Sequence, residues 1–348
     1  MSEPPPAATR PSPTGPRNLI TDVPGLKVGQ AEDERRRTGV TVILPDARAV
    51  AACDVRGGAP GTREIDVLSS ENLVDALDAV VLSGGSVYGL AAADGVTAWL
   101  GEQGRGYRLS TAPGVPPSPI VSQAILTDLA NGGDKAWGQA PPYRALGVTA
   151  AQAAGLDFAL GTAGAGYGAM SGRLKGGVGS ASVVSSDGFT VGALAAVNSF
   201  GAAVAPQSRA FWAAPFEIGE EFGGLGAAQL RADPEDWGLA KGAPAVRANT
   251  TIACVAVDAD LTPAEARRLA IMAQAGLVRA LRPAHTSFDG DVVFALATAR
   301  RPIQGPRQMA VTRLGDLAAD CLARAIARGV YEATPWPGTD VRCWRDLD

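Results

Sequence analysis

The stretch NTTIACVAVDADLTPAEARRLAIMAQAGLVRAL (249–281) decides how the fold is predicted, because it joins a strand to a helix. TTIACVAVDAD (250–260) is apolar and rich in β-branched residues, which indicates a buried strand. The residues that follow, 261–281, form the clearest helical pattern in the sequence. Its start carries a capping residue, a proline at the first helical position and a glutamate that completes a capping box: Thr262, Pro263 and Glu265. The chain therefore runs from a buried strand directly into a well-delimited helix.

Further strands and helices are predicted on both sides of this stretch, without a regular βαβ repeat. Short apolar or β-branched runs predict strands over 38–45, 49–55, 78–85, 156–168 and 291–299. SASVVSS (180–186) and FTVGALAAVNSFG (189–201) predict a hairpin around Asp187-Gly188. Helical spacing of apolar residues predicts helices over 86–103, 146–155 and 313–333. The mixed order indicates an α+β fold, with sheets covered by helices, rather than a doubly wound sheet.

Composition excludes several classes of protein. The chain has 348 residues, 46% of them hydrophobic, which is ample for a large core. Its net charge of −4 gives no attraction to nucleic acid, and the basic stretch 300–313 is diluted by prolines and predicts a solvated loop. The longest apolar run, 191–206, contains Asn198 and Ser199 and is too short to span a membrane. A soluble protein without nucleic-acid or membrane partners is therefore expected.

The termini and the cysteines suggest a cytoplasmic protein. Residues 1–17 are rich in Pro, Ser and Ala, which predicts a disordered tail and not a signal peptide. The four cysteines lie far apart without CxxC spacing, so neither a disulfide framework nor a zinc knuckle is expected. The long segment 202–248 is predicted to be a loop, and loops of that length tend to be functional.

A single histidine, His285, restricts the catalytic chemistry. A zinc hydrolase usually needs two or three histidine ligands, and a Ser–His–Asp triad would have to place its base at this one position. We therefore expect no metal, and a hydrolytic mechanism, if there is one, that works without imidazole.

Asn249-Thr250-Thr251 allows two interpretations. Thr250 can simply open a strand, for which its branched side chain is suited. Alternatively, its hydroxyl attacks the Asn249 carbonyl, and an N→O acyl shift followed by hydrolysis breaks the chain. The α-amine that is released has a reference pKa of about 7.7–8 and can act as a general base at neutral pH. The second interpretation needs no histidine.

HTSFDGD (285–291) is the next candidate, since Asp289 and Asp291 flank a glycine. In an extended segment residues i and i+2 point to the same side, so the two carboxylates could orient the amine and hydroxyl of Thr250 or share a proton. The alternative is an ordinary Asp-Gly turn.

Two polar residues in small or apolar surroundings also stand out. Lys175, in RLKGGVGSAS (173–182), precedes two glycines and could bring a cation close to a substrate or nucleophile. Asn198 lies within an apolar run and is either a satisfied core amide or an oxyanion donor. The glycines of GAGYGA (164–169) match a GxGxxA dinucleotide fingerprint, but no helical pattern follows them, so no nucleotide cofactor is expected.

Six motifs in order resemble the self-cleaving L-aminopeptidase/D-esterase and β-peptidyl aminopeptidase family, over roughly residues 18–335. They are ITDVPGLKVGQ, VVLSGGSVYGLAAADGV, GAGYG with LKGGVGSAS, AVNSFG, NTTIACVAVDADLT and HTSFDGDVVFALAT. The threonine after Asn249 and the aspartate pair are most similar to the nylon-oligomer hydrolase branch, whereas the aminopeptidase branch has Ser as nucleophile, with Ser and Glu in place of the aspartates.

The resemblance implies a role for each candidate residue. Thr250 is the nucleophile, Asp289 and Asp291 orient and tune it, and Lys175 and Asn198 line the pocket, with Asn198 as an oxyanion donor. The family also places a tyrosine near the oxyanion, for which Tyr143 is the candidate.

The resemblance also implies a fold and an assembly. We expect a four-layer αββα sandwich of the N-terminal-nucleophile type, in one domain over 18–348, cut into fragments 1–249 and 250–348 that stay associated in a homotetramer. The substrate would be a small peptide or an ω-amino-acid (nylon-type) oligomer, with no cofactor. Aminopeptidase activity on L- or β-amino acids and acyl transfer of the ornithine acetyltransferase type remain alternatives.

Overall fold

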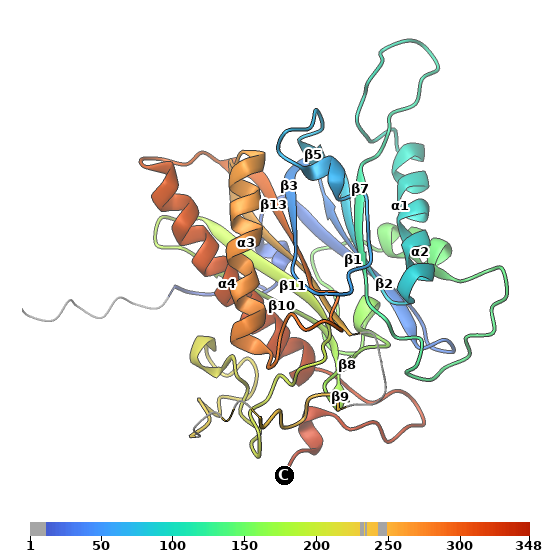
Figure 1. Ribbon diagram of the computed structural model, residues 1–348. Helices are drawn as coiled ribbons and strands as arrows, with labels where there is room; N and C mark the ends of the chain where they lie inside the picture. The colour runs from blue at the N-terminus through green and yellow to red at the C-terminus, as the bar shows by residue number, and fades with distance from the viewer. Residues whose placement is uncertain (1–11, 230–232, 234, 243–248) are drawn as a thin grey trace, which may run out of the picture.

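Two β-sheets lie face to face in the computed structural model, which describes residues 12–229, 233, 235–242 and 249–348 (Figure 1). The first sheet has the strand order β1-β2-β6-β7-β4, with bounds Leu26–Asp33, Thr38–Pro45, Ala79–Ser83, Val121–Ile125 and Thr62–Arg63. The second has the order β10-β11-β12-β13-β3-β5, with bounds Gly177–Val184, Thr190–Asn198, Thr250–Ala259, Val292–Arg301, Ala49–Val55 and Ala76–Leu77. Strand β12 is thus hydrogen-bonded on both sides, antiparallel to β11 and parallel to β13.

A pair of helices covers the outer face of each sheet (Figure 1). Helices α1 (Ala91–Glu102) and α2 (Tyr143–Gln152) pack on the first sheet, and α3 (Pro263–Ala280) and α4 (Arg307–Tyr331) pack on the second. The resulting order of layers is helix, sheet, sheet, helix. The predicted α+β, four-layer αββα sandwich in a single domain is therefore confirmed.

Strand β12 shows how the sequence produces these layers. Its alternate residues Ile252, Cys254 and Ala256 pack in the core between the two sheets. The residues between them, Ala253, Val255 and Val257, pack under α3 and α4. Because both faces are buried, the strand is apolar throughout and does not alternate with polar residues. Even-numbered residues of β12 consequently face the opposite sheet.

Most predicted elements are confirmed. Strands β2 and β3 have the predicted bounds, and β10 and β11 form the predicted hairpin. Helix α3 begins after Thr262, whose hydroxyl accepts from Glu265 N while the Glu265 carboxylate accepts from Thr262 N, as a capping box requires. The predicted helix 86–103 divides into a 3-10 turn, Ser86–Leu90, and α1.

The predicted strand over 156–168 is wrong. Its pairing with a strand is an isolated bridge between Gly161 and Val178 of β10, and the Gln30 side chain bonds both Ala159 N and Ala159 O. Farther along, Gly164–Gly166 forms a 3-10 turn that leads into the short strand pair β8 (Met170–Ser171) and β9 (Leu174–Lys175). The glycines of the GxGxxA match therefore do not open a helix.

Two boundary predictions also need correction. The stretch 300–313 is not a loop throughout, because β13 extends to Arg301 and α4 begins at Arg307, whose guanidinium bonds Glu265 at the start of α3. The disordered tail was predicted to reach residue 17, but Val184 N donates to Pro13 O and Gly15 N to Ser182 Oγ, so this part lies along β10. Residues 1–11 lie outside the described part of the chain.

Membrane-spanning helices and disulfides are both absent from the described part of the chain. Within it, no helix is long and apolar enough to cross a bilayer. The four cysteines, all of them in this part, are buried thiols that form no disulfide.

Candidate active site

Thr250 is the first residue of β12, and the sheet register places Asn198, the last residue of β11, directly opposite it. Even-numbered residues of both strands, such as Leu194 and Ile252, pack between the sheets. Side chains directly opposite each other in a sheet lie on the same face. Thr250 and Asn198 therefore both face the space between the sheets, at the point where β11 ends and β12 begins.

The peptide bond between Asn249 and Thr250 is held by three hydrogen bonds. Thr250 Oγ1 donates to the Asn249 carbonyl oxygen, which also accepts from Gly290 N at 2.8 Å. On the other side of the residue, Asn249 N donates to Phe288 O at 3.0 Å. Asn249 and Thr250 are both buried. The hydroxyl thus lies beside the carbonyl group that it would attack, with a backbone N–H on the carbonyl oxygen.

Gly290 allows this close approach because it has no side chain. A Cβ atom there would lie 2.8 Å from Thr250 Oγ1 and 2.7 Å from Ala59 O. The glycine between the two aspartates is therefore required by packing against the threonine, and not by an unusual backbone angle.

Asp289 joins the end of β11 to its own turn. Its Oδ1 accepts from Phe200 N at 3.1 Å, and its Oδ2 accepts from Thr286 N at 3.1 Å and Thr286 Oγ1 at 2.5 Å. Burial and the neighbouring charge of Asp291 raise the pKa of Asp289, although these hydrogen bonds act in the opposite direction. Asp289 is therefore able to retain a proton at a pH at which an exposed aspartate has lost it.

Asp291 joins the start of β12 to His285. Its Oδ1 accepts from Thr251 N at 2.8 Å, and its Oδ2 accepts from His285 N at 3.1 Å. The imidazole Nδ1 of His285 also lies 3.0 Å from Asp291 Oδ2. The composition led us to expect a mechanism without imidazole, yet the one histidine of the chain lies against a candidate catalytic carboxylate. No spacing in the sequence indicated this contact beyond their common turn.

The glycine-rich loop RGGAPG (56–61) packs under the same turn. Arg56 N and Gly57 N donate to Asp291 O, and Ala59 N donates to Asp289 O at 2.8 Å. Gly57 has no room for a side chain against the backbone of the two aspartates. The sequence does not connect this loop with the site, because the two segments are far apart in the chain.

Lys175 is fully buried at the end of β9, and its ammonium donates to three backbone carbonyls, those of Gly166, Ala169 and Gly176, at 3.2, 3.1 and 2.6 Å. It also lies 5.0 Å from the ring centroid of Trp336. Burial lowers the pKa of Lys175 to about 7. The lysine is thus close to its neutral form at physiological pH, but its hydrogen bonds go to backbone carbonyls and not to Thr250.

Asn198 is held in a similar way. Its Oδ1 accepts from Met170 N at 2.9 Å, and its Nδ2 donates to Thr127 O at 3.0 Å. These bonds fit the satisfied core amide, one of the two interpretations of this residue, while its register opposite Thr250 keeps the oxyanion role open.

The sequence profile of peptidase family S58 matches residues 18–343, nearly the whole described chain. The chain belongs to peptidase family S58. The uncharacterized aminopeptidase Rv1333 of Mycobacterium tuberculosis is 45% identical to it over 95% of this chain and 98% of its own. The 6-aminohexanoate-oligomer endohydrolase of Kocuria sp. is 29% identical over 90% and 86%.

Two solved structures share the fold of this S58 peptidase. A Burkholderia sp. beta-aminopeptidase has a TM-score of 0.68 at 24% identity, covering 92% of this chain and 88% of its own. The L-aminopeptidase D-Ala-esterase/amidase of Ochrobactrum anthropi, described as a variant of the Ntn hydrolase fold, has a TM-score of 0.67 at 22% identity, covering 96% and 91%. The predicted family and N-terminal-nucleophile type of fold are confirmed. The protein is a hydrolase that acts on amide bonds.

Tyr143, the candidate oxyanion tyrosine, lies in another part of this S58 peptidase. It is fully buried in the core between the first sheet and helices α1 and α2, with its ring over Gly85 and edge-on to Trp137. Asp128 is near enough to raise the pKa of its phenol further, after burial. Thr127, the neighbour of Asp128, accepts from Asn198, so this segment connects Tyr143 with the site.

Lys241 is a site residue that the sequence did not reveal. Its ammonium donates to Asn249 Oδ1 at 2.7 Å and to Asn198 O at 3.4 Å, on either side of the peptide bond described above. The residue belongs to the loop 202–248, where no periodic pattern singles out any position, and residues 243–248 of that loop lie outside the described part. Only the folded chain brings Lys241 to Asn249.

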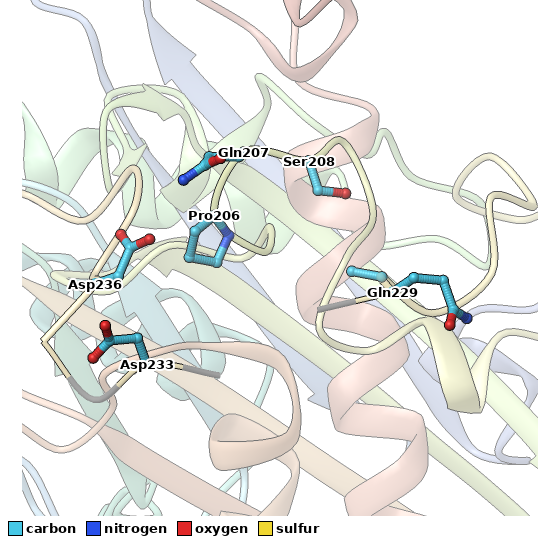
Figure 2. A pocket seen from close by; sticks show the side chains of 7 residues that line it. Pro206, Gln207, Ser208, Gln229, Asp233 and Asp236 are labelled. Atoms are coloured by element: carbon cyan, nitrogen blue, oxygen red, sulfur yellow. The ribbon is translucent and has the colours of Figure 1, made fainter. Parts of the chain in front are cut away.

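A separate hollow of ≈ 370 Å³ lies in the same loop (Figure 2). Figure 2 shows Asp233 and Asp236 on one side of it and Gln229 on the other, with Pro206 and Ser208 between them. Its lining includes none of the candidate catalytic residues, so the chemistry described above does not depend on it.

Proposed function

We propose that this S58 peptidase cleaves its own chain at Asn249–Thr250 and then hydrolyses amides through an ester on Thr250. One observation carries the proposal: Thr250 Oγ1 donates to the carbonyl oxygen of Asn249. Attack of this hydroxyl oxygen on the carbonyl carbon forms a new C–O bond. The C–N bond then breaks, and the nitrogen takes the hydroxyl proton. Water hydrolyses the ester, leaving a carboxylate on Asn249 and a free amine on Thr250.

The contacts of the turn support the same chemistry. Gly290 N donates to the oxygen that becomes negative in the tetrahedral intermediate, which is how backbone donors stabilise an oxyanion. Asp289 holds the backbone just after the end of β11, at Phe200, and Asp291 holds the backbone just after Thr250, at Thr251. Within the proposal, the freed α-amine is the general base for each substrate, and Asn198 is a second donor near the oxyanion.

The substrate of the proposed enzyme is a linear amide or peptide. Relatives named 6-aminohexanoate-oligomer endohydrolase support nylon-type oligomers, and a more similar relative named an aminopeptidase supports N-terminal aminoacyl groups. Transfer of the acyl group to an amine instead of water, as in ornithine acetyltransferases, is the remaining alternative. In every case Thr250 carries the acyl group.

The purified protein tests the proposal on a denaturing gel and by intact-mass measurement. We expect two fragments, 1–249 and 250–348, and a single uncleaved and inactive chain for Thr250→Ala. Thr250→Ser is the matched control, because it keeps a hydroxyl and should still cleave. A wild-type chain that stays intact and yet hydrolyses amides at full rate would contradict the proposal. Amine acceptors such as ornithine, added to the cleaved enzyme, distinguish transfer from hydrolysis.

The assembly belongs to the same proposal. We expect the two fragments to remain together as a homotetramer in the cytoplasm. Light scattering after size-exclusion chromatography measures the mass of that assembly.

A further inference from the structure

The peptide bond that the chain would cleave shows where an acyl group must lie. In the proposed self-cleavage, the acyl group that Thr250 attacks is that of Asn249. In later turnovers the same hydroxyl attacks the substrate, so the substrate's acyl group must occupy the place of Asn249. The contacts of Asn249 therefore describe the acyl subsite. This inference rests on the proposed function and specifies its substrate.

Three contacts define that subsite. The Asn249 carbonyl oxygen accepts from Gly290 N at 2.8 Å, and Asn249 N donates to Phe288 O at 3.0 Å. Both contacts are made by the backbone, so any α-aminoacyl group can repeat them. The third contact belongs to the side chain, since Asn249 Oδ1 accepts from Lys241 Nζ at 2.7 Å. Of these three contacts with described residues, this one can discriminate between one acyl group and another.

Lys241 is well placed for this role. Its backbone N donates at 2.9 Å to the carbonyl oxygen of Phe200, the residue whose N–H bonds Asp289, and its ammonium also donates to Asn198 O. The loop that carries the lysine is thus tied to the end of β11. Lys175 differs, because its ammonium is fully buried and bonded to three backbone carbonyls. Of these two lysines, Lys241 is the one in contact with the acyl group.

We propose that Lys241 is a specificity residue and that the acyl subsite prefers aminoacyl groups with an oxygen acceptor on the β-carbon, namely asparaginyl and aspartyl groups. The ammonium bonds the β-carboxamide or β-carboxylate oxygen, as it bonds Asn249 Oδ1. An apolar side chain of the same size leaves the ammonium without that partner. A chain that ends in an ammonium, such as a 6-aminohexanoyl group, places like charge near it.

The cleaved enzyme tests the preference with p-nitroanilides of asparagine, aspartate, leucine and 6-aminohexanoate. Leucine is the matched control, because it has nearly the shape of asparagine without its polar atoms. A hydrogen bond to a charged group corresponds to a factor of about 10 to 100, so we expect kcat/KM for asparaginyl and aspartyl substrates to exceed that for leucyl by this factor. Equal values, or a preference for leucyl or 6-aminohexanoyl substrates, would overturn the inference.

Lys241→Met should lower the ratio of kcat/KM for asparaginyl substrates to kcat/KM for leucyl substrates toward one. Lys27→Met is the control variant, since Lys27 is an exposed residue of β1 paired with Asp46 and should change neither rate. An equal loss on asparaginyl and leucyl substrates would mean that Lys241 has only a structural role.

Self-cleavage provides a second measurement that needs no added substrate. Asn249→Leu and Lys241→Met each remove one partner of the contact, so their effects on the cleavage rate should be non-additive in the double variant. Additive effects would contradict the contact. Failure of this inference is distinguishable from failure of the proposed function, because a Thr250-dependent enzyme that prefers leucyl substrates refutes only the subsite.

Discussion

Two sites in this protein hold buried carboxylates in different ways: Glu221 in one, and Asp289 with Asp291 in the other. Glu221 lies against the guanidinium of Arg324, which contacts its two carboxylate oxygens at 2.5 and 2.9 Å and also bonds Asn18 Oδ1. Within the part of the chain that the structure describes, Asp289 and Asp291 have no arginine among their hydrogen-bond partners. Their oxygens accept from backbone N–H groups, the Thr286 hydroxyl and His285.

The difference appears in the protonation of the two groups. Burial opposes charge at Glu221, but the hydrogen bonds and charge of Arg324 outweigh it and lower the pKa of that carboxyl. Burial and the charge of Asp291 instead raise the pKa of Asp289. The ion pair of Arg324 and Glu221 keeps Glu221 ionised and holds α4 in place. Asp289, next to Thr250, is instead able to exchange a proton. A buried carboxylate without a cation is thus the better indication of chemistry.

Asp289→Asn should have the largest effect. The amide keeps the size of the side chain but puts an NH2 group against donors, Phe200 N or those of Thr286, and can no longer exchange a proton. We expect self-cleavage and amide hydrolysis to fall by about 10²–10⁴-fold, the range of acid–base groups. Gel densitometry over time and kcat/KM measure the two rates. Glu221→Gln is the control, and equal rate losses in both variants would remove the distinction between the two carboxylate groups.

Arg324→Met should destabilise the protein without changing its chemistry. The substitution removes both hydrogen bonds from Arg324 to Glu221 and leaves the Arg328 guanidinium, 3.9 Å away, as the nearby cation, so we expect a loss of up to about 3–5 kcal/mol in the free energy of unfolding. Urea unfolding of the Thr250→Ala background, in which the chain stays covalently whole, measures the change. Glu221→Met in the same chain should restore part of the loss. A variant as stable as its parent would show that this pair contributes little.

The smallest expected effect is a pair of opposite pH slopes. An unfolded aspartate loses its proton near pH 3.8, whereas Asp289 keeps it to a higher pH, so its contribution to stability falls as the pH rises through the raised pKa. Glu221 has a lowered pKa, so its contribution is present above pH 4.5 and is lost as the pH falls through the folded value. Urea midpoints of unfolding are measured between pH 3 and about 7 for the wild type and both variants. The difference between the wild type and Asp289→Asn should fall as the pH rises, whereas the difference between the wild type and Glu221→Gln should grow. Parallel slopes would contradict this assignment.

The sequence predicted the α+β class and several elements because those depend on local patterns, whereas the four-layer order was implied by the resemblance to the family, and the nucleophile stays a prediction. The apolar run of β12, the capping box of α3 and the Asp-Gly hairpin of β10 and β11 each carry their signal within a few residues. The strand expected over 156–168 failed because its pairing with β10 is an isolated bridge at Gly161, and a side chain 129 residues away, Gln30, bonds the backbone of Ala159.

The contacts of the site were less accessible to sequence reasoning. Asp289 and Asp291 were found because they flank one glycine in a short motif. Lys241, in contrast, reaches Asn249 from a loop without periodicity, and Arg324 lies on the buried face of α4 although arginine usually marks an exposed one. His285 was set aside on composition, yet its contact with Asp291 depends on a tight turn that the sequence does not specify.

The place of β12 within its sheet has a consequence for a cleaved chain. Strands β10, β11, β3 and β5 come from residues before Thr250, and they flank β12 and β13, which come after it, on both sides. Two fragments interleaved in this way can separate only if the hydrogen bonds between β11 and β12 and between β13 and β3 all break. Once apart, they would have to find each other by diffusion, so refolding would depend on concentration and the persistence of the cut protein would be set by its rate of unfolding.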